Sequence, residues 1–174
     1  MSNIYDQGMP RNAANHVAIS PLTFIERAAS VYPDLPAVVH GQTRRDWATT
    51  WQRCRRLASA LERRGLGKGD TVSVMLPNVP AMFEAHFGVP LVGCVLNTLN
   101  IRLDASAIAY MLEHAETRAI LVDPEFVEVV REAIKGLDKP PLIIDVLDPE
   151  FEGQAERLGE IEYEDLLAEG DADY

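Results

Sequence analysis

The stretch GDTVSVMLPN, residues 69–78, decides the fold of this chain of 174 residues. Its centre, Thr71 to Leu76, is a short and mostly apolar run with a turn signal on each side, Gly69-Asp70 before it and Pro77-Asn78 after it. Short apolar runs of this kind are typical of strands that are buried on both faces of a sheet. The stretch therefore predicts the first strand of a parallel sheet.

Downstream of this strand, helical and strand patterns alternate. We predict helices over residues 80–92, 104–115, 124–135 and 161–169, and strands over residues 94–96, 118–122 and 141–147. Asp104 and Asp123 suit helix N-caps, and Pro90 kinks or ends the first of these helices. Strands that alternate with helices are joined by right-handed crossovers. The predicted fold class is therefore α/β, with a mostly parallel, doubly wound sheet.

Upstream of the strand, the sequence predicts two helices around a hairpin. The first helix begins at Ser20, with Pro21 in its first turn, or at Thr23, with Glu26 three residues on, and it ends at Tyr32-Pro33. Its apolar face carries Phe24, Ile25, Ala28 and Val31. Gly41-Gln42 suits a two-residue turn between strands at 37–40 and 43–45. The strongest helical pattern then runs from Trp47 to Arg64 and stops at Gly65.

Charge and cysteine content exclude several classes of protein. The formal net charge is −11, and all of it falls in residues 145–174, which hold 12 acidic residues and one base, Arg157. An acidic chain of this kind is a poor candidate for binding nucleic acid. The longest apolar stretch, residues 87–96, is too short for a membrane span, which needs ~20 residues. Cys54 and Cys94 are expected to be buried, reduced thiols, and we expect a cytoplasmic protein.

Searches for catalytic motifs name no activity. The run Gly65 to Asp70 resembles a phosphate loop, but it leaves a helix and enters a strand, so we interpret it as a helix stop followed by a turn. The histidines share no metal-ligand spacing, and we interpret each as structural or surface-exposed: His16, His40, His86 and His114. The paired carboxylates Asp148/Glu150 and Glu162/Glu164 are expected to be solvated. We therefore assign no catalytic, cofactor-binding or metal-binding residue.

A basic cluster over residues 44–68 has two interpretations. Half of the basic residues of the chain lie there, and Arg53, Arg56 and Arg63 are expected to face away from the stripe that contains Trp47 and Trp51. The simpler interpretation is a solvated helix face. In the other, this face contacts the acidic end of the chain or the phosphates of a coenzyme.

Taken in order, several short segments of the chain resemble the N-terminal region of acyl-CoA synthetases, in the adenylate-forming superfamily. The segments span residues 20–170: Pro21–Phe24, Trp47, Gly69–Val72, Pro77-Asn78, Gly93–Asn97, Asn100, Arg102-Leu103, Leu121–Asp123 and Tyr163–Leu167. The sequence of residues 78–90 is similar to that of short- and medium-chain acyl-CoA ligases, including 3-methylmercaptopropionate-CoA ligases. The resemblance implies that a carboxylic acid is activated as an acyl-adenylate with ATP and Mg²⁺, after which coenzyme A displaces AMP. It also implies a homodimer.

The family's phosphate-binding signature, a Thr-Ser-Gly-Thr-Thr-Gly run followed by Pro-Lys-Gly, is absent from these residues. We therefore expect an inactive N-terminal portion of a longer ligase. Its divisions would be an arm (1–19), an incomplete α/β sheet subdomain (20–147) and an acidic connector with a short helix that leads toward the phosphate-binding loop (148–174). The alternative is a stand-alone, non-catalytic binding or scaffold module derived from a ligase.

Overall fold

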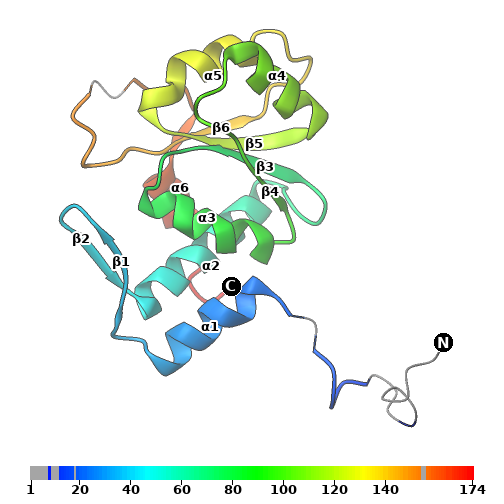
Figure 1. The fold of residues 1–174 in the computed structure, drawn as a ribbon, viewed down its shortest axis with the longest axis vertical. Helices are drawn as coiled ribbons and strands as arrows, with labels where there is room; N and C mark the ends of the chain where they lie inside the picture. Colours follow the sequence, from blue (N-terminus) through cyan, green and yellow to red (C-terminus); the bar gives the residue numbers. More distant parts are fainter. Residues whose placement is uncertain (1–7, 9–11, 18, 154–155) are drawn as a thin grey trace.

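A five-stranded parallel sheet forms the centre of the computed structural model, which describes residues 8, 12–17, 19–153 and 156–174 (Figure 1). The spatial order is β4-β3-β5-β6-β7, and every neighbouring pair is parallel. The strands are β3 (Thr71–Met75), β4 (Val95–Thr98), β5 (Thr117–Val122), β6 (Leu142–Asp145) and β7 (Ile161–Glu162). The predicted fold class is thus confirmed, and most of the predicted arm over residues 1–19 lies outside the described residues.

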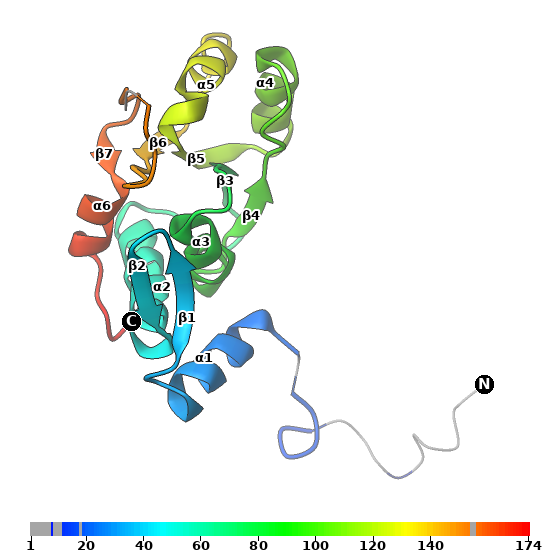
Figure 2. The same cartoon turned by 60° about the vertical axis from the view of Figure 1, so that its left-hand side comes forward.

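Helices cover both faces of this sheet, as a doubly wound fold requires (Figure 2). One face packs against α2 (Trp47–Arg63), α3 (Pro80–Leu91) and α6 (Tyr163–Glu169). The other face packs against α4 (Ala105–His114), the 3-10 turn η2 (Pro124–Phe126) and α5 (Val127–Ile134). The side chains of β3 point alternately to the two faces of the sheet and so contribute to both cores. Val72 and Val74 belong to the first core and Met75 to the second.

The predicted helix starts and turns are largely confirmed by the capping contacts. The Asp104 carboxylate accepts a hydrogen bond from Ala107 N–H at 2.9 Å, and the Asp123 carboxylate accepts one from Glu125 N–H at 3.0 Å. Gly65 has a φ of +78°, which only glycine adopts without strain, and it ends α2. Two segments differ from the prediction in the type of element that they form. The helix after Asp123 begins with the 3-10 turn η2, and the segment predicted as one helix over residues 161–169 begins instead with strand β7.

Helix α1 (Pro21–Val31) begins at the first of the two predicted positions, because the Ser20 hydroxyl accepts a hydrogen bond from Leu22 N–H at 3.3 Å. Its predicted apolar face is partly wrong. Ile25 is buried, but Phe24 and Val31 are 64% and 49% exposed. The helix lies at the edge of the molecule and packs mainly against α2 and α3, so the stripe of side chains that it buries is narrower than its sequence predicts.

A hairpin formed by β1 (Pro36–His40) and β2 (Thr43–Asp46) makes a separate two-stranded antiparallel sheet (Figure 1). Gly41, in the turn, has a φ of +49°. Two contacts hold the tip of the hairpin to the loop after β6. His40 Nε2 lies 2.9 Å from an Asp148 carboxylate oxygen, and Gln42 N–H donates to Glu150 at 3.0 Å. Asp148 and Glu150 are therefore partners of the hairpin. The predicted solvation is wrong for Asp148, whose side chain is mostly buried, whereas Glu150 is exposed as predicted.

Candidate functional site

The strand order places a topological switch point between β3 and β5. From β3 the chain crosses first to β4 on one side and then back to β5 on the other. Ligands of open α/β sheets bind outside the carboxyl ends of the strands at such a point. Asn78 follows β3 there and is exposed, and Asp123 follows β5 and is buried. Burial raises the pKa of the Asp123 carboxyl group, and the neighbouring Glu125 and Asp148 carboxylates add to this effect.

The turns that follow β3 and β5 do not fit the phosphates of a nucleoside triphosphate such as ATP. A phosphate is held by glycine-rich turns from a strand into a helix. The turn after β3 runs from Leu76 to Val79 and the turn after β5 is Asp123-Pro124, and neither contains glycine. Within the described ranges, no group of three or more His, Cys, Asp or Glu side chains could hold a metal ion such as Mg²⁺. We therefore assign no residue to ATP or to Mg²⁺.

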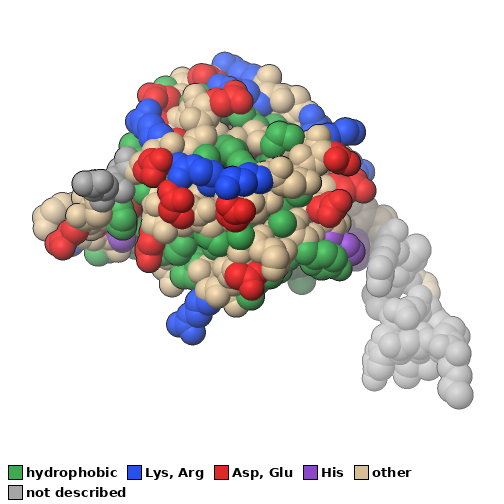
Figure 3. All heavy atoms as spheres, turned by 90° about the horizontal axis from the view of Figure 1, so that it is seen from above, with side chains coloured by type: hydrophobic (Ala, Val, Ile, Leu, Met, Phe, Trp, Pro, Cys, Tyr) green, Lys and Arg blue, Asp and Glu red, His purple; other side chains and the backbone are tan. Residues whose placement is uncertain are grey.

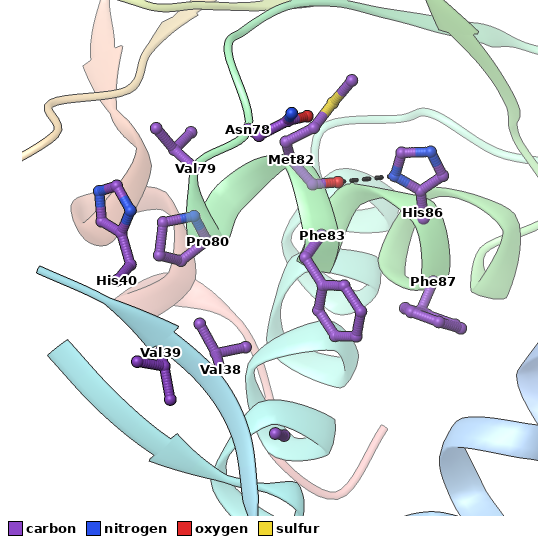
Figure 4. A pocket seen from close by; sticks show the side chains of 11 residues that line it. Val38, Val39, His40, Asn78, Val79, Pro80, Met82, Phe83, His86 and Phe87 are labelled. Atoms are coloured by element: carbon purple, nitrogen blue, oxygen red, sulfur yellow. Dashed lines mark hydrogen bonds between the residues drawn. The ribbon is translucent and has the colours of Figure 1, made fainter.

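An open groove of about 500 Å³ begins at the same edge, between β1 and α3 (Figure 4). Its walls are mainly apolar and include Val38 and Val39 of β1 on one side and Val79, Phe83 and Phe87 on the other. The Phe83 ring packs against the Phe87 ring, with centroids 5.2 Å apart, and lies 6.4 Å from that of Trp47. Such a groove suits an apolar chain or side chain rather than a charged group.

Two of the histidines noted in the sequence line this groove. His86 Nδ1 donates to the carbonyl oxygen of Met82, one turn earlier in α3, at 2.8 Å. His40 is held by Asp148, as described above. His114 lies elsewhere, stacked on Tyr110 with ring centroids 5.5 Å apart. Each of these three rings has a structural partner or lies on the surface, as predicted. No local pattern indicates that His40 and His86 line the same groove.

Beside the groove, Glu84 of α3 carries a buried carboxylate whose hydrogen-bond partners come from three other elements. Its side chain is fully buried within α3. One oxygen accepts hydrogen bonds from Arg45 Nη1 of β2 at 2.8 Å and from Arg53 Nε of α2 at 2.7 Å. The other accepts one from the Tyr163 hydroxyl group of α6 at 2.8 Å. The two arginines supply the opposite charge that a buried carboxylate requires.

Arg53 also reaches outward to the acidic end of the chain. Its guanidinium donates to both oxygens of Glu164, at 2.8 and 2.6 Å. Burial disfavours charge on both groups, yet the pKa of Arg53 is raised by Glu164 and Glu84, and that of Glu164 is lowered by the hydrogen bonds and charge of Arg53. The geometry is bidentate, the strong form of an arginine–carboxylate pair.

The basic face of α2 is therefore not a solvated surface. Arg56 donates to the carbonyl oxygen of Gly170 at 3.0 Å, Arg64 contacts the Glu169 carboxylate at 2.8 Å, and Arg63 donates to the Glu169 carbonyl oxygen. The second interpretation of the basic cluster, contact with the acidic end of the chain, is confirmed. The predicted solvation is wrong for Glu162, which is buried and caps α6 by accepting a hydrogen bond from Glu164 N–H at 2.9 Å, whereas Glu164 stays exposed while Arg53 engages both of its oxygens.

The opposite face, over α4 and α5, carries basic and acidic side chains that are intermixed (Figure 3). Arg131 pairs there with Glu128 and with Glu156, the latter at 2.6 Å. A nucleic-acid interface needs a basic surface of one sign. The face seen in Figure 3 offers none.

Both cysteines are buried free thiols, as predicted. Burial raises the pKa of Cys94 to about 11 and raises that of Cys54 further. Only the thiolate reacts, so we expect Cys94 in the native protein to be alkylated at pH 8 roughly 100-fold more slowly than after unfolding. Because the fold favours the protonated thiols, the stability that they contribute is complete below pH ~8.5 and falls as the pH rises toward 11.

Iodoacetamide labelling followed by peptide mass spectrometry measures this protection at each thiol. Labelling in denaturant gives the unprotected rate for the same peptides. Equal rates of Cys94 alkylation in the native and the unfolded protein would contradict its burial.

Of the helices described, none combines the length and the apolar composition that a bilayer-spanning segment needs.

Comparison with solved structures shows which proteins share this fold. An anthranilate CoA ligase in complex with anthranoyl-AMP superimposes with a TM-score of 0.78 at 16% identity, over 87% of this chain and 28% of that one. A benzoate CoA ligase from Burkholderia xenovorans superimposes with a TM-score of 0.72 at 20% identity, over 86% and 28% of the two chains. At these identities the likeness shows the fold alone.

Comparison of sequences shows to which family of proteins this chain is related. An acetate–CoA ligase of Humulus lupulus and a peroxisomal acetate/butyrate–CoA ligase of Arabidopsis thaliana are each 45% identical to this chain, over 95% of its length. The matched region is 31% of each relative, so the chain spans about a third of their length. The model of the family described as "AMP-binding enzyme" matches residues 25–171. Since this match covers most of the chain, the protein belongs to the AMP-binding enzyme family.

Proposed function

We propose that these residues are the N-terminal portion of an ATP-dependent ligase that joins a short- or medium-chain carboxylic acid to coenzyme A. One observation carries this proposal. Over 95% of its length the chain is 45% identical to two relatives, one named an acetate–CoA ligase and the other an acetate/butyrate–CoA ligase. A butyrate–CoA ligase of Arabidopsis at 40% identity supports the same acid class. The finer assignment of 3-methylmercaptopropionate as the substrate rests only on the resemblance of the sequence of residues 78–90.

The reaction proposed for the whole protein has two steps. The carboxylate displaces pyrophosphate from ATP to form an acyl-adenylate, and the thiol of coenzyme A then displaces AMP to form a thioester. Residues 1–174 would serve this reaction as a scaffold, with residues 148–174 as the segment that leads toward the phosphate-binding loop.

The cellular location and the oligomeric state of the whole protein are proposed separately from its activity. The expected cytoplasmic location draws no support from the Arabidopsis relatives, because two of those named above are called peroxisomal. A homodimer is a prediction from the family resemblance, and the mass of the native protein in solution tests it.

The test of this function uses the native gene product, its intact mass and a panel of acids. We expect a protein several times heavier than 19.3 kDa that forms thioesters from ATP, coenzyme A and acetate, butyrate or 3-methylmercaptopropionate. Omission of ATP or of coenzyme A should abolish product, and purified residues 1–174 should catalyse no acid-dependent exchange of pyrophosphate into ATP. A native product of 19.3 kDa without thioester formation would favour the alternative, a non-catalytic binding or scaffold module.

A further inference from the structure

A cavity of about 850 Å³ lies at the amino ends of β3 and β5, between the end of α4 and the loop after α5. Its walls come from residues 69–71, 112–118 and 137–140. Along β3, Val72 and Val74 point to the core under α2 and α3, and Met75 points to the core under α4 and α5. Because strand side chains alternate, Thr71 points to the same side as Met75, which is the side of the cavity.

The floor of this cavity carries a hydroxyl group that has no partner. Thr71 is only 8% exposed, and its side chain makes no hydrogen bond to any residue that the structure describes. Thr117, which stands opposite it in the sheet, is already paired with the Ser73 hydroxyl group at 2.8 Å. Within the described ranges, Arg55 Nε is the only fully enclosed side-chain polar atom without a partner, so the Thr71 hydroxyl group opens into the cavity. A bound molecule can supply the partner that such a buried group needs.

The rim of the cavity has an excess of negative charge. Asp70 and Arg118 lie 2.9 Å apart and neutralise each other. Three of the four other charged side chains are negative and one is positive, which leaves a net charge of −2: Glu113, Glu116, Asp138 and Lys139. Glu116 also has a φ of +49°, in the left-handed region that favours glycine, so the fold holds this carboxylate at the rim against backbone strain.

We propose that this cavity binds an aliphatic polyamine, a chain of methylene groups that carries several ammonium groups. Hydroxyl and carboxylate oxygens both accept hydrogen bonds from ammonium groups, so one ammonium group binds Thr71 and the others pair with the rim carboxylates. The methylene segments pack on Leu112 and Leu137 in the walls. A metal ion fits less well, because no group of three or more His, Cys, Asp or Glu side chains in the described part of the chain could hold one. The inference goes beyond the proposed ligase function and does not depend on it.

Isothermal titration calorimetry of the intact native protein with spermidine, at physiological ionic strength, tests this site. We expect saturable binding at one site. Thr71→Val should weaken it about 10-fold, because a hydrogen bond from a charged donor is lost. Valine has nearly the shape of threonine and suits a strand, so the variant should fold. Absence of saturable binding, or equal affinity of Thr71→Val and the unchanged protein, would overturn the proposal.

A pair of charge variants separates this cavity from the acidic end of the chain, which attracts any polycation. Glu116→Gln removes one carboxylate from the rim, and Glu152→Gln removes one from an exposed position outside the cavity. We expect Glu116→Gln to weaken spermidine binding about 3-fold and Glu152→Gln to leave it unchanged. An equal loss in the two variants would assign the polyamine to the acidic end and refute the site.

Discussion

We expect Glu84→Gln to lower the free energy of unfolding of the intact protein by about 3 kcal/mol or more, because removal of one partner from a buried ion pair costs ~3–5 kcal/mol. The substitution keeps the shape of the side chain but removes the charge that compensates Arg45 and Arg53. Both arginines are mostly buried, so water replaces the lost carboxylate poorly. Urea denaturation followed by circular dichroism gives the change.

Two variants separate charge from hydrogen bonding in this network. Glu164→Gln removes a carboxylate that is half exposed, and we expect it to cost less than about 1 kcal/mol. Tyr163→Phe removes only the phenolic hydrogen bond to Glu84, and we expect a cost of about 1 kcal/mol. If Glu84→Gln were no more harmful than Glu164→Gln, the buried ion pair would not be the main polar contribution to the packing of α3 on α2.

The second large effect is expected at Gly88, where α3 lies against α2. A Cβ atom on Gly88 would lie 2.9 Å from the carbonyl oxygen of Cys54 and 2.7 Å from Leu57 Cδ2. The first of these neighbours is backbone and cannot rotate away, so the two helices must separate. We expect Gly88→Ala to destabilise the intact protein by about 2 kcal/mol, in the range of overpacked cores, and Gly88→Val to cost more or to prevent folding.

Gly136 provides the matched control for this prediction. It follows α5, and a Cβ atom there would meet no atom within 4 Å. Gly136→Ala should therefore change the free energy of unfolding by less than about 0.5 kcal/mol. A denaturation midpoint of Gly88→Ala that matched that of Gly136→Ala would show that α2 and α3 have room to adjust.

Local sequence patterns predicted the elements because the relevant interactions are themselves local. The Asp104 side chain caps a residue three positions away, and Gly65 ends α2 by its own φ angle. The two-residue strand β7 has no local pattern that separates it from α6. Its Ile161 and Glu162 become a strand only because Ile144 and Asp145 of β6 stand beside them.

The polar network could not be predicted from local patterns. Glu84 lies in a helix that is apolar on most sides, and its partners are 39, 31 and 79 positions away along the chain. Charge counting identified the two halves of the contact between α2 and the acidic end, but it left open whether they meet. The groove was also hidden, because its walls come from β1 and from the segment around α3, which only the tertiary fold brings together.

The order of the partners of Glu84 along the chain has a consequence during synthesis. Arg45 and Arg53 precede Glu84, so both cations have already been made when the carboxylate leaves the ribosome. Tyr163 follows 79 positions later, which corresponds to ~4–16 s at a translation rate of ~5–20 residues per second. The nascent chain can therefore neutralise the charge of Glu84 early, while the hydroxyl group that completes its hydrogen bonding arrives only with α6.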